Sequence, residues 1–445
     1  MAKKGNIVKR TKSDIRLLVI VLLAVSWVCV VMNLGVDKEK EEQAALIETA
    51  KVYLEDKLYI RAVNNYKTAL NDYDTENNAL LETELVALYL EAGMMEDYYE
   101  LIEARVEKGT AAEAEYLELA DMYIEEERYT KAIPILKSGI EHYENAQMIE
   151  KKEKIIYEHR VKTVNLPELK QPEKNWIVPA FDGEKWGYIT NSGDVLLDFI
   201  YEEATQFCNG YAVVRLDGVY TLIDENGYWN AIDKIGLDFV TDISESAIVG
   251  IKDEKYQIYS RTFQLLSEES YDQVYLNDNG LYMVQKDGKW AILSSDMEPV
   301  TDYLFADVAV NSKGKVFSGS YAMVKDERGY CLINQDGEAL YEERFADAKG
   351  FEGGLCAVAD VNGKWGFANE NGEIIVDFQY GDACSFSSNL AAVEYGGFWG
   401  YINRYNKMII EPKYVAAYPF VNNCAIAETE IGNYEILTLR YFELF

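Results

Sequence analysis

One aromatic position recurs eight times between residues 186 and 434 of this 445-residue chain. The clearest copies are Trp186-Gly187, Trp365-Gly366 and Trp399-Gly400, each followed by Tyr or Phe. The other copies place one aromatic at the same point of the pattern: Tyr220, Tyr256, Trp290, Tyr330 and Tyr434. Successive members of this set, here called the anchor aromatics, are 34, 36, 34, 40, 35, 34 and 35 residues apart. A fixed period of this size indicates a repeat architecture, in which each unit buries its apolar face against the next.

Each repeat contains three short apolar runs, as at residues 390–393, 399–402 and 408–410. Turns rich in Gly, Asn and Asp separate these runs, which is typical of strands in an antiparallel meander. We expect the anchor aromatics to fill the core between adjacent units. The glycine after tryptophan is expected to leave room for a ring or for a neighbouring backbone. The pattern predicts an all-β repeat domain over residues 176–445.

Two arrangements of the eight units fit the period. The units can circle into a β-propeller or stack linearly as a β-hairpin solenoid. Propeller blades usually hold four strands in 40–50 residues, whereas this period gives about three strands in 35. The number of units favours the propeller-like ring, and the solenoid is the alternative.

Residues 40–163 show helical periodicity, with apolar residues spaced by three and four positions. Three windows, which begin at Tyr53, Tyr89 and Tyr123, align with offsets of 36 and 34 residues. This segment resembles the tetratricopeptide repeat, whose period is 34. The resemblance implies either a concave groove for a peptide or partner helix, or a spacer. Residues 164–175 include two prolines among charged residues, which predicts a linker.

Residues 17–34 are uncharged and long enough, as a helix, to cross the hydrocarbon core of a bilayer. Residues 1–16 are basic, and acidic residues follow the apolar run. The positive-inside rule therefore predicts a basic cytoplasmic tail (1–16), a transmembrane signal anchor (17–36) and an extracytoplasmic bulk. A cleaved signal peptide is the alternative.

Composition excludes several classes of function. The net charge is −33, and such a surface repels nucleic acid. The six cysteines show no C-x-x-C pair or metal-ligand spacing, and Cys356 and Cys424 occupy one repeat position, which predicts small buried residues. The chain has only two histidines, His142 and His159, so a histidine-based catalytic or metal site is not expected.

Three turns resemble the start of a calcium-binding loop: residues 224–227, 334–337 and 369–372. None has the glutamate that completes an EF-hand loop, and each falls between two predicted strands. We therefore predict hairpin turns rather than metal sites. The chain contains no G-x-S-x-G, P-loop or H-E-x-x-H motif. No catalytic residue, cofactor or metal is predicted, although paired carboxylates for glycoside hydrolysis are neither located nor excluded.

The β-repeats resemble the bacterial WG-repeat family, whose units carry G-x-W-G-[YF]-[IA]-x-x-x-G and later aromatics. Residues 183–193, 363–372 and 397–406 match best. The copies at Tyr220, Tyr256, Tyr330 and Tyr434 depart from the pattern, with Tyr for Trp and no following Gly. The resemblance implies a fold family but indicates little about ligands or catalytic residues.

Together these patterns predict a multidomain α-then-β chain that acts as a membrane-anchored, extracytoplasmic binding or scaffold protein, not an enzyme. Its repeat surfaces would face a protein or glycan of the cell envelope. The alternatives are a polymer-degrading hydrolase that uses acidic residues, and a sensor that signals through the single helix. The repeats appear even along the chain, and the only outlier is the 40-residue spacing that contains residues 311–320.

Overall fold

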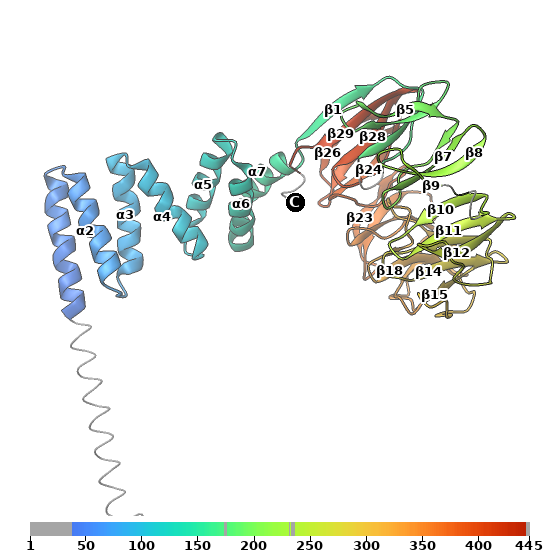
Figure 1. The fold of residues 1–445 in the computed structure, drawn as a ribbon. Helices are drawn as coiled ribbons and strands as arrows, with labels where there is room; N and C mark the ends of the chain where they lie inside the picture. The colour runs from blue at the N-terminus through green and yellow to red at the C-terminus, as the bar shows by residue number, and fades with distance from the viewer. Residues whose placement is uncertain (1–37, 173–175, 231, 233–235, 442–445) are drawn as a thin grey trace, which may run out of the picture. The chain divides into compact units, whose positions relative to one another are not determined.

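The computed structural model of this protein describes residues 38–172, 176–230, 232 and 236–441. The chain divides into two compact units, with the division between Lys152 and Glu153. Helices form the first unit, and antiparallel strands form nearly all of the second (Figure 1). We call them the helical unit and the β unit.

The helical unit begins with a helical run over residues 38–55. The helices that follow are α2 (Tyr59–Asp72), α3 (Asn78–Ala92), α4 (Met95–Glu107), α5 (Glu113–Glu125), α6 (Tyr129–Tyr143) and α7 (Ala146–Ile156). Each helix from α2 to α5 packs against the next one along the chain. Ala62 in α2 and Ala132 in α6 are fully buried, as expected where small residues let two helices approach closely. The likeness to tetratricopeptide repeats stays a prediction.

The expected membrane helix requires a correction. Within the described residues no helix is long and apolar enough to cross a membrane. Helices α3 and α6 have 15 residues each, which corresponds to about 22 Å at 1.5 Å per residue. The helical run over residues 38–55 is rich in Lys and Glu. This finding contradicts the predicted single-pass protein with an extracytoplasmic bulk. The segment on which that prediction rested, residues 17–36, lies outside the described residues.

The described strands of the β unit form eight small antiparallel sheets. The first four sheets contain β2 (Glu168–Leu169), β3 (Ile177–Phe181), β4 (Trp186–Thr190) and β5 (Val195–Tyr201); β6 (Glu203–Ala204), β7 (Tyr211–Leu216), β8 (Val219–Asp224) and β9 (Trp229–Asn230); β10 (Phe239–Ile243), β11 (Ala247–Lys252) and β12 (Lys255–Ser260); and β13 (Gln273–Leu276), β14 (Tyr282–Lys286) and β15 (Lys289–Leu293).

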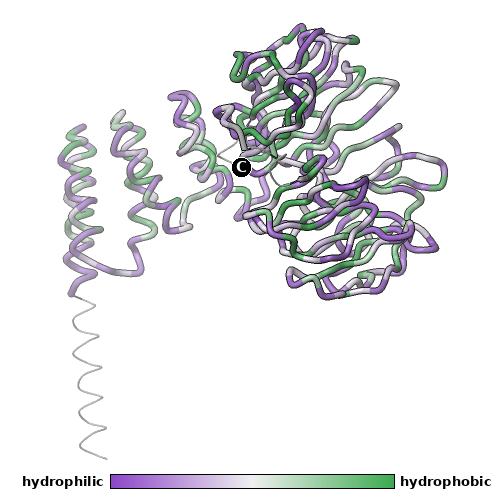
Figure 2. The backbone as a smooth tube through the Cα atoms, turned by 45° about the vertical axis from the view of Figure 1, so that its right-hand side comes forward, coloured by the Kyte–Doolittle hydropathy of each residue, from purple (hydrophilic) through white to green (hydrophobic). Residues whose placement is uncertain are grey.

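The next three sheets contain β16 (Asp307–Ala309), β17 (Phe317–Ser318), β18 (Tyr321–Lys325) and β19 (Tyr330–Ile333); β20 (Asp347–Ala348), β21 (Leu355–Ala359), β22 (Trp365–Asn369) and β23 (Ile374–Tyr380); and β24 (Leu390–Tyr395), β25 (Phe398–Asn403) and β26 (Met408–Tyr414). The eighth contains β27 (Ala416–Ala417), β28 (Cys424–Glu430), β29 (Asn433–Leu439) and β1 (His159–Val164). In Figure 2, short hydrophobic segments alternate with hydrophilic ones along the β unit, as the apolar runs and polar turns of the sequence predict.

An aromatic pair marks the outer edge of most sheets. Trp186 pairs with Tyr201, Trp290 with Phe305, and Trp365 with Tyr380, always 15 residues apart. The eighth sheet lacks such a pair. Its anchor aromatic Tyr434 lies opposite Val164, which belongs to β1 at the start of the β unit.

Strand β1 closes the array. It pairs with β29 in antiparallel register from His159–Leu439 to Val164–Tyr434. Buried apolar clusters join each of the first six sheets to the next, and the ring of Tyr401 in the seventh sheet lies 5.1 Å from that of Phe420, which leads into the eighth. The eighth sheet packs on the first through the cluster that contains Cys424 and Val178. The sheets therefore form a closed ring, as in a β-propeller, which an open solenoid would not do.

The boundaries of the β unit differ from those expected. Strand β1 begins at His159, inside the segment predicted to be helical (40–163), and ends at Val164, the first residue of the predicted linker, where β2 also lies. Strand β1 pairs with β29, about 275 residues further along the chain, and β2 pairs with β3. Local periodicity does not identify such pairing partners.

The glycine after tryptophan makes room for backbone. A Cβ atom on Gly366 would lie 2.4 Å from the carbonyl oxygen of Val376, and one on Gly400 would lie 2.5 Å from that of Ile410. In both sheets the last strand has an irregular register at this point, which brings its carbonyl close. Of the two explanations considered from sequence, the close backbone is therefore the correct one.

Five anchor aromatics are buried, as expected for core residues: Trp186, Trp290, Tyr330, Trp365 and Tyr434. The other three, Tyr220, Tyr256 and Trp399, are half-buried. Those five residues belong to the buried core, and Tyr256 has a different environment, described below.

Candidate functional site

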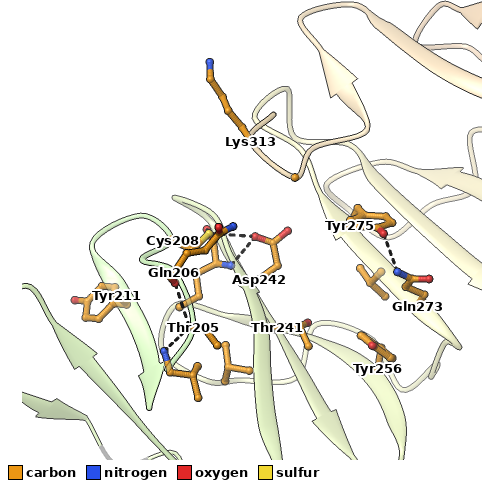
Figure 3. A pocket seen from close by; sticks show the side chains of 15 residues that line it. Thr205, Gln206, Cys208, Tyr211, Thr241, Asp242, Tyr256, Gln273, Tyr275 and Lys313 are labelled. Atoms are coloured by element: carbon orange, nitrogen blue, oxygen red, sulfur yellow. Dashed lines mark hydrogen bonds between the residues drawn. The ribbon is translucent and has the colours of Figure 1, made fainter. Parts of the chain in front are cut away.

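A cavity of about 260 Å³ opens between the second, third and fourth sheets. It is lined by residues that follow or belong to the first strand of each sheet: Thr205 and Gln206 after β6, Thr241 and Asp242 in β10, and Gln273 and Tyr275 in β13. Tyr256 of β12 forms part of the wall, and Lys313 and Gly314 reach the cavity from the fifth sheet (Figure 3).

This cavity lies on the inner side of the ring. The ammonium of Lys315, in the fifth sheet, lies 2.8 Å from the carboxylate of Asp242, in the third. These sheets are separated by the fourth, so residues from both can meet only where the sheets converge toward the ring's middle. The first strand of each sheet is therefore its inner strand.

In several sheets the third residue, counted from the start of the inner strand, packs on the anchor aromatic of the same sheet. We call this third residue the cover position. Lys170 at this position lies 4.0 Å from the ring centre of Trp186, and Lys349 lies 4.7 Å from that of Trp365. Tyr275 stacks on Trp290 with ring centres 5.5 Å apart. In each case a long side chain covers the anchor aromatic of its own sheet.

The second and third sheets have small residues at the cover position. Thr205 follows Ala204, which pairs with the central strand as Val274 does in the fourth sheet. Thr241 likewise follows Val240, at the point where the register of the third sheet shifts between Val240 and Asp242. A threonine is too short to cover a tyrosine ring. The ring face of Tyr256 therefore borders the cavity. The cavity exists because the cover positions of two successive sheets carry small residues.

The loop between β16 and β17 forms one wall of the cavity and is fixed from several sides. The side-chain oxygen of Asn277 accepts hydrogen bonds from the backbone N–H groups of Val316 (3.1 Å) and Phe317 (2.9 Å). The carboxylate of Glu352 accepts one from Ser312 N–H at 3.0 Å. The loop is thereby tied to the fourth and sixth sheets as well as to Asp242.

Asp242 is held by four donors. Its Oδ1 accepts hydrogen bonds from Lys315 Nζ (2.8 Å), the N–H of Ile243 (2.8 Å) and Cys208 Sγ (3.4 Å), and its Oδ2 accepts one from the N–H of Leu276 (3.1 Å). Burial is the largest single influence on the pKa of Lys315 and lowers it, but the charge of Asp242, its hydrogen bond and the nearby Cys208 and Asp278 together outweigh burial, so the net pKa lies above its ordinary value. Lys315 therefore remains charged at neutral pH, and its charge is compensated within the protein.

Apart from Lys313, the remaining polar side chains of the cavity are neutral. Figure 3 shows the amide nitrogen of Gln273 bonded to the hydroxyl of Tyr275, at 2.8 Å, and Cys208 beside Asp242. The hydroxyl of Thr205 donates to the carbonyl of Gln206. In the described part of the chain, the side chains of Gln206 and Thr241 make no hydrogen bond.

Only one residue predicted from sequence lies in this cavity. Tyr256 lines it, whereas the other anchor aromatics lie elsewhere in the ring. Residues 311–320, which the sequence marks only as the outlier in spacing, form the loop that supplies Lys313, Gly314 and the buried Lys315. The signal was the 40-residue spacing between Trp290 and Tyr330, where the other spacings are 34–36.

The three turns that resemble calcium loops use their oxygens locally. Asn369 Oδ1 accepts the N–H groups of Asn371 and Glu373, both at 3.0 Å, and Asn334 and Asp224 have the same pattern. Gly372 has φ +80°, a conformation that favours glycine. Side-chain oxygens bonded to their own backbone in this way form hairpin turns.

Cys331, Cys356 and Cys424 are buried, which confirms the expectation of small buried residues for Cys356 and Cys424. Burial raises the pKa of Cys356, Cys384 and Cys424 to about 12. Such thiols are unreactive at neutral pH, because the thiolate is the nucleophile.

The closed array of eight antiparallel sheets and the cavity on its inner side define the class, a ring-shaped β-repeat protein. Five segments of the chain match the WG containing repeat: residues 186–220, 270–290, 330–365, 365–397 and 399–430. The chain therefore contains WG repeats, as its sequence resemblance implied, and the match indicates a repeat-containing binding or scaffold protein.

No curated protein matches this chain. Among solved structures, one described as the crystal structure of the eukaryotic initiation factor is 11% identical, with a TM-score of 0.39, over 59% of this chain and 81% of that one. The AfRom2 CNH domain is also 11% identical, with a TM-score of 0.30, over 64% of this chain and 99% of that one. Similarity at this level implies nothing about the function of this protein.

Proposed function

We propose that this protein is a non-enzymatic binding protein whose β unit captures its partner at the inner cavity. The observation that carries the proposal is the uncovered ring of Tyr256. The equivalent rings of Trp186, Trp290 and Trp365 are covered by a side chain of their own sheet. An uncovered aromatic face beside neutral polar groups is typical of a ligand site.

The departures from the repeat pattern support this location. The two longest stretches between matched segments are residues 221–269 and 291–329. The first contains Thr241, Asp242 and Tyr256, and the second contains the loop with Lys313. Part of the cavity lining thus lies where the chain deviates from its own repeat, whereas Gln206 and Gln273 lie in matched segments.

The charged groups favour binding over catalysis. Asp242 is the only carboxylate among the described residues that line the cavity, and its two oxygens already accept four hydrogen bonds. Hydrolysis of a glycosidic bond requires two carboxyl groups, about 5–10 Å apart, on either side of the bond. The hydrolase alternative therefore finds less support in this cavity than the binding role.

We further propose that the partner is a protein or a glycan, and that the helical unit acts as a scaffold segment. The acidic surface does not suit nucleic acid, which binds to clustered Lys and Arg. Helix pairs such as α5 and α6 offer a regular surface for a partner helix or peptide.

The test is a binding screen with the full chain. Soluble glycan and peptide libraries are screened by thermal shift and ligand-observed NMR against wild type and Thr241→Tyr. This substitution puts at the third sheet the cover residue that Tyr275 supplies at the fourth, so we expect the ring to fold and the cavity to fill. Lys349→Tyr, at the cover position of the sixth sheet, is the matched control.

Ligands are expected to bind wild type and the Lys349→Tyr control but not Thr241→Tyr. Binding that Thr241→Tyr leaves unchanged would place the partner elsewhere and contradict the proposal. Release of new reducing ends from a bound glycan would make the protein an enzyme and overturn the non-enzymatic role.

A further inference from the structure

The lining of the inner cavity is specific enough to indicate a ligand class. We infer that it binds one neutral, hydroxyl-rich ring, namely a single unit of a saccharide. This inference rests on the proposed function and specifies its ligand. It follows from four properties of the lining: an open aromatic face, uncommitted neutral polar groups, compensated charge and limited size.

The aromatic face comes from Tyr256. Its ring is part of the cavity lining, and Figure 3 shows it near the small side chain of Thr241. The C–H faces of a sugar ring are apolar while its edge carries hydroxyls, so a sugar can stack on tyrosine and still form hydrogen bonds in its own plane. A tyrosine offers the same combination of apolar face and polar tip.

The polar groups suit hydroxyls in particular. The Gln206 amide and the Thr241 hydroxyl make no hydrogen bond in the part of the chain that the structure describes. Gln273 uses an amide hydrogen on Tyr275 and keeps its carbonyl oxygen as an acceptor. Amides and hydroxyls can both donate and accept, which matches a ligand whose groups do the same.

The charges of the lining argue against an ionic ligand. Asp242 is paired with Lys315 at 2.8 Å, and Lys313 lies 3.9 Å from the carboxylate of Glu352. A phosphate, a carboxylate or a free amino group would therefore meet no unpaired countercharge and would lose hydration on entry. A neutral ligand avoids this cost.

The size of the cavity limits what can enter. The volume of about 260 Å³ lies just below the usual range of ligand pockets, roughly 300–1,000 Å³. A cavity of this size has room for one sugar ring but not for an extended oligosaccharide. Gln206 and Thr241 are exposed, so the cavity is open on their side and a longer chain can continue outward.

The test uses isothermal titration and saturation-transfer NMR on the full chain. The probes are the methyl glycosides of glucose, galactose and N-acetylglucosamine, with glucose 6-phosphate and the dipeptide Ala-Ala as comparison ligands. At least one neutral glycoside is expected to bind, and the two comparison ligands are not. Tyr256→Ala is expected to weaken binding about tenfold through loss of the stacking face.

Several variants make the test specific. Tyr256→Phe, which keeps the ring, is expected to lose less affinity than Tyr256→Ala, and Gln206→Ala is expected to weaken binding without changing the melting temperature. Thr241→Tyr is expected to abolish binding, with Lys349→Tyr as the control. If Thr241→Tyr does not fold, Gln206→Ala still decides, because Gln206 is exposed.

The outcomes separate this inference from the proposed function. If the dipeptide or the phosphate binds in a Thr241-dependent manner and no neutral sugar does, the saccharide assignment is overturned while the cavity remains the binding site. If neutral glycosides bind equally to wild type and Thr241→Tyr, the cavity is not their site. If none of the probes binds, the assignment to a single sugar ring is wrong.

Discussion

The ammonium of Lys315 lies 2.8 Å from the carboxylate of Asp242, although the two residues are 73 positions apart and belong to sheets that are not neighbours. Both side chains are almost completely buried. The pair joins the one irregular loop of the ring to the third sheet, next to the cavity. It thereby fixes a wall of the proposed binding site.

Removing Lys315 should destabilise the β unit strongly. Lys315→Met leaves Asp242 buried without its countercharge, which typically costs about 3–5 kcal/mol. Urea unfolding of the full chain measures this. The control is Lys286→Met, whose ion pair with Glu269 is exposed and should contribute less than about 1 kcal/mol. Equal effects of the two substitutions would argue against a buried pair.

Closure of the ring by β1 can be tested on one strand. Val164 is buried between the eighth and first sheets, whereas Val161 in the same strand is 46% exposed. Val164→Asp buries a charge and should cost at least about 3 kcal/mol. Val161→Asp should change the free energy of unfolding by about 0.5 kcal/mol or less. If β1 were not part of the ring, both variants would behave alike.

The anchor aromatics should contribute to the free energy of unfolding according to how deeply each is buried. Trp365 is buried in the cluster between the sixth and seventh sheets, so Trp365→Ala should cost about 3–5 kcal/mol. Trp399 is half-buried, and Trp399→Ala should cost clearly less. Chemical denaturation measures both. A Trp365→Ala protein as stable as wild type would show that this ring is not a core residue.

Cysteine alkylation should depend steeply on pH. With a pKa near 12, Cys356, Cys384 and Cys424 are about one part in ten thousand thiolate at pH 8. Iodoacetamide should therefore label them slowly in the native protein, with rates that rise about tenfold per pH unit. Mass spectrometry of the labelled peptides checks this, and labelling in urea is the control. Fast native labelling at pH 8 would contradict the buried positions.

Calcium should not stabilise the fold specifically. The oxygens of Asn334 and Asn369 that would bind a metal already accept backbone N–H groups of their own turns. Calcium and magnesium at matched ionic strength should therefore shift the melting temperature equally, through screening of the acidic surface. A rise of several degrees with calcium alone, abolished by Asp336→Ala, would reverse the turn assignment.

The sequence by itself determined those features that depend only on residues close together along the chain. The period of about 35 residues, the turns such as 369–372 and the glycine at Gly366 all follow from local periodicity and backbone conformation, and the structure contains them. The helical segment and the burial of Ala62 and Cys356 are local features of the same kind. The predicted membrane helix was a local interpretation too, and the described residues contain no helix that supports it.

Only the tertiary structure decided which distant segments meet. The pairing of Val164 with Tyr434 closes the ring, and the contact of Lys315 with Asp242 places the irregular loop beside the cavity. Thr241 and Tyr256 come from different strands of the third sheet, and only the folded structure brings both to the wall of one cavity. Strand pairing and ion pairs join residues that are far apart in sequence. A repeat pattern does not show which of its equivalent positions will border a cavity.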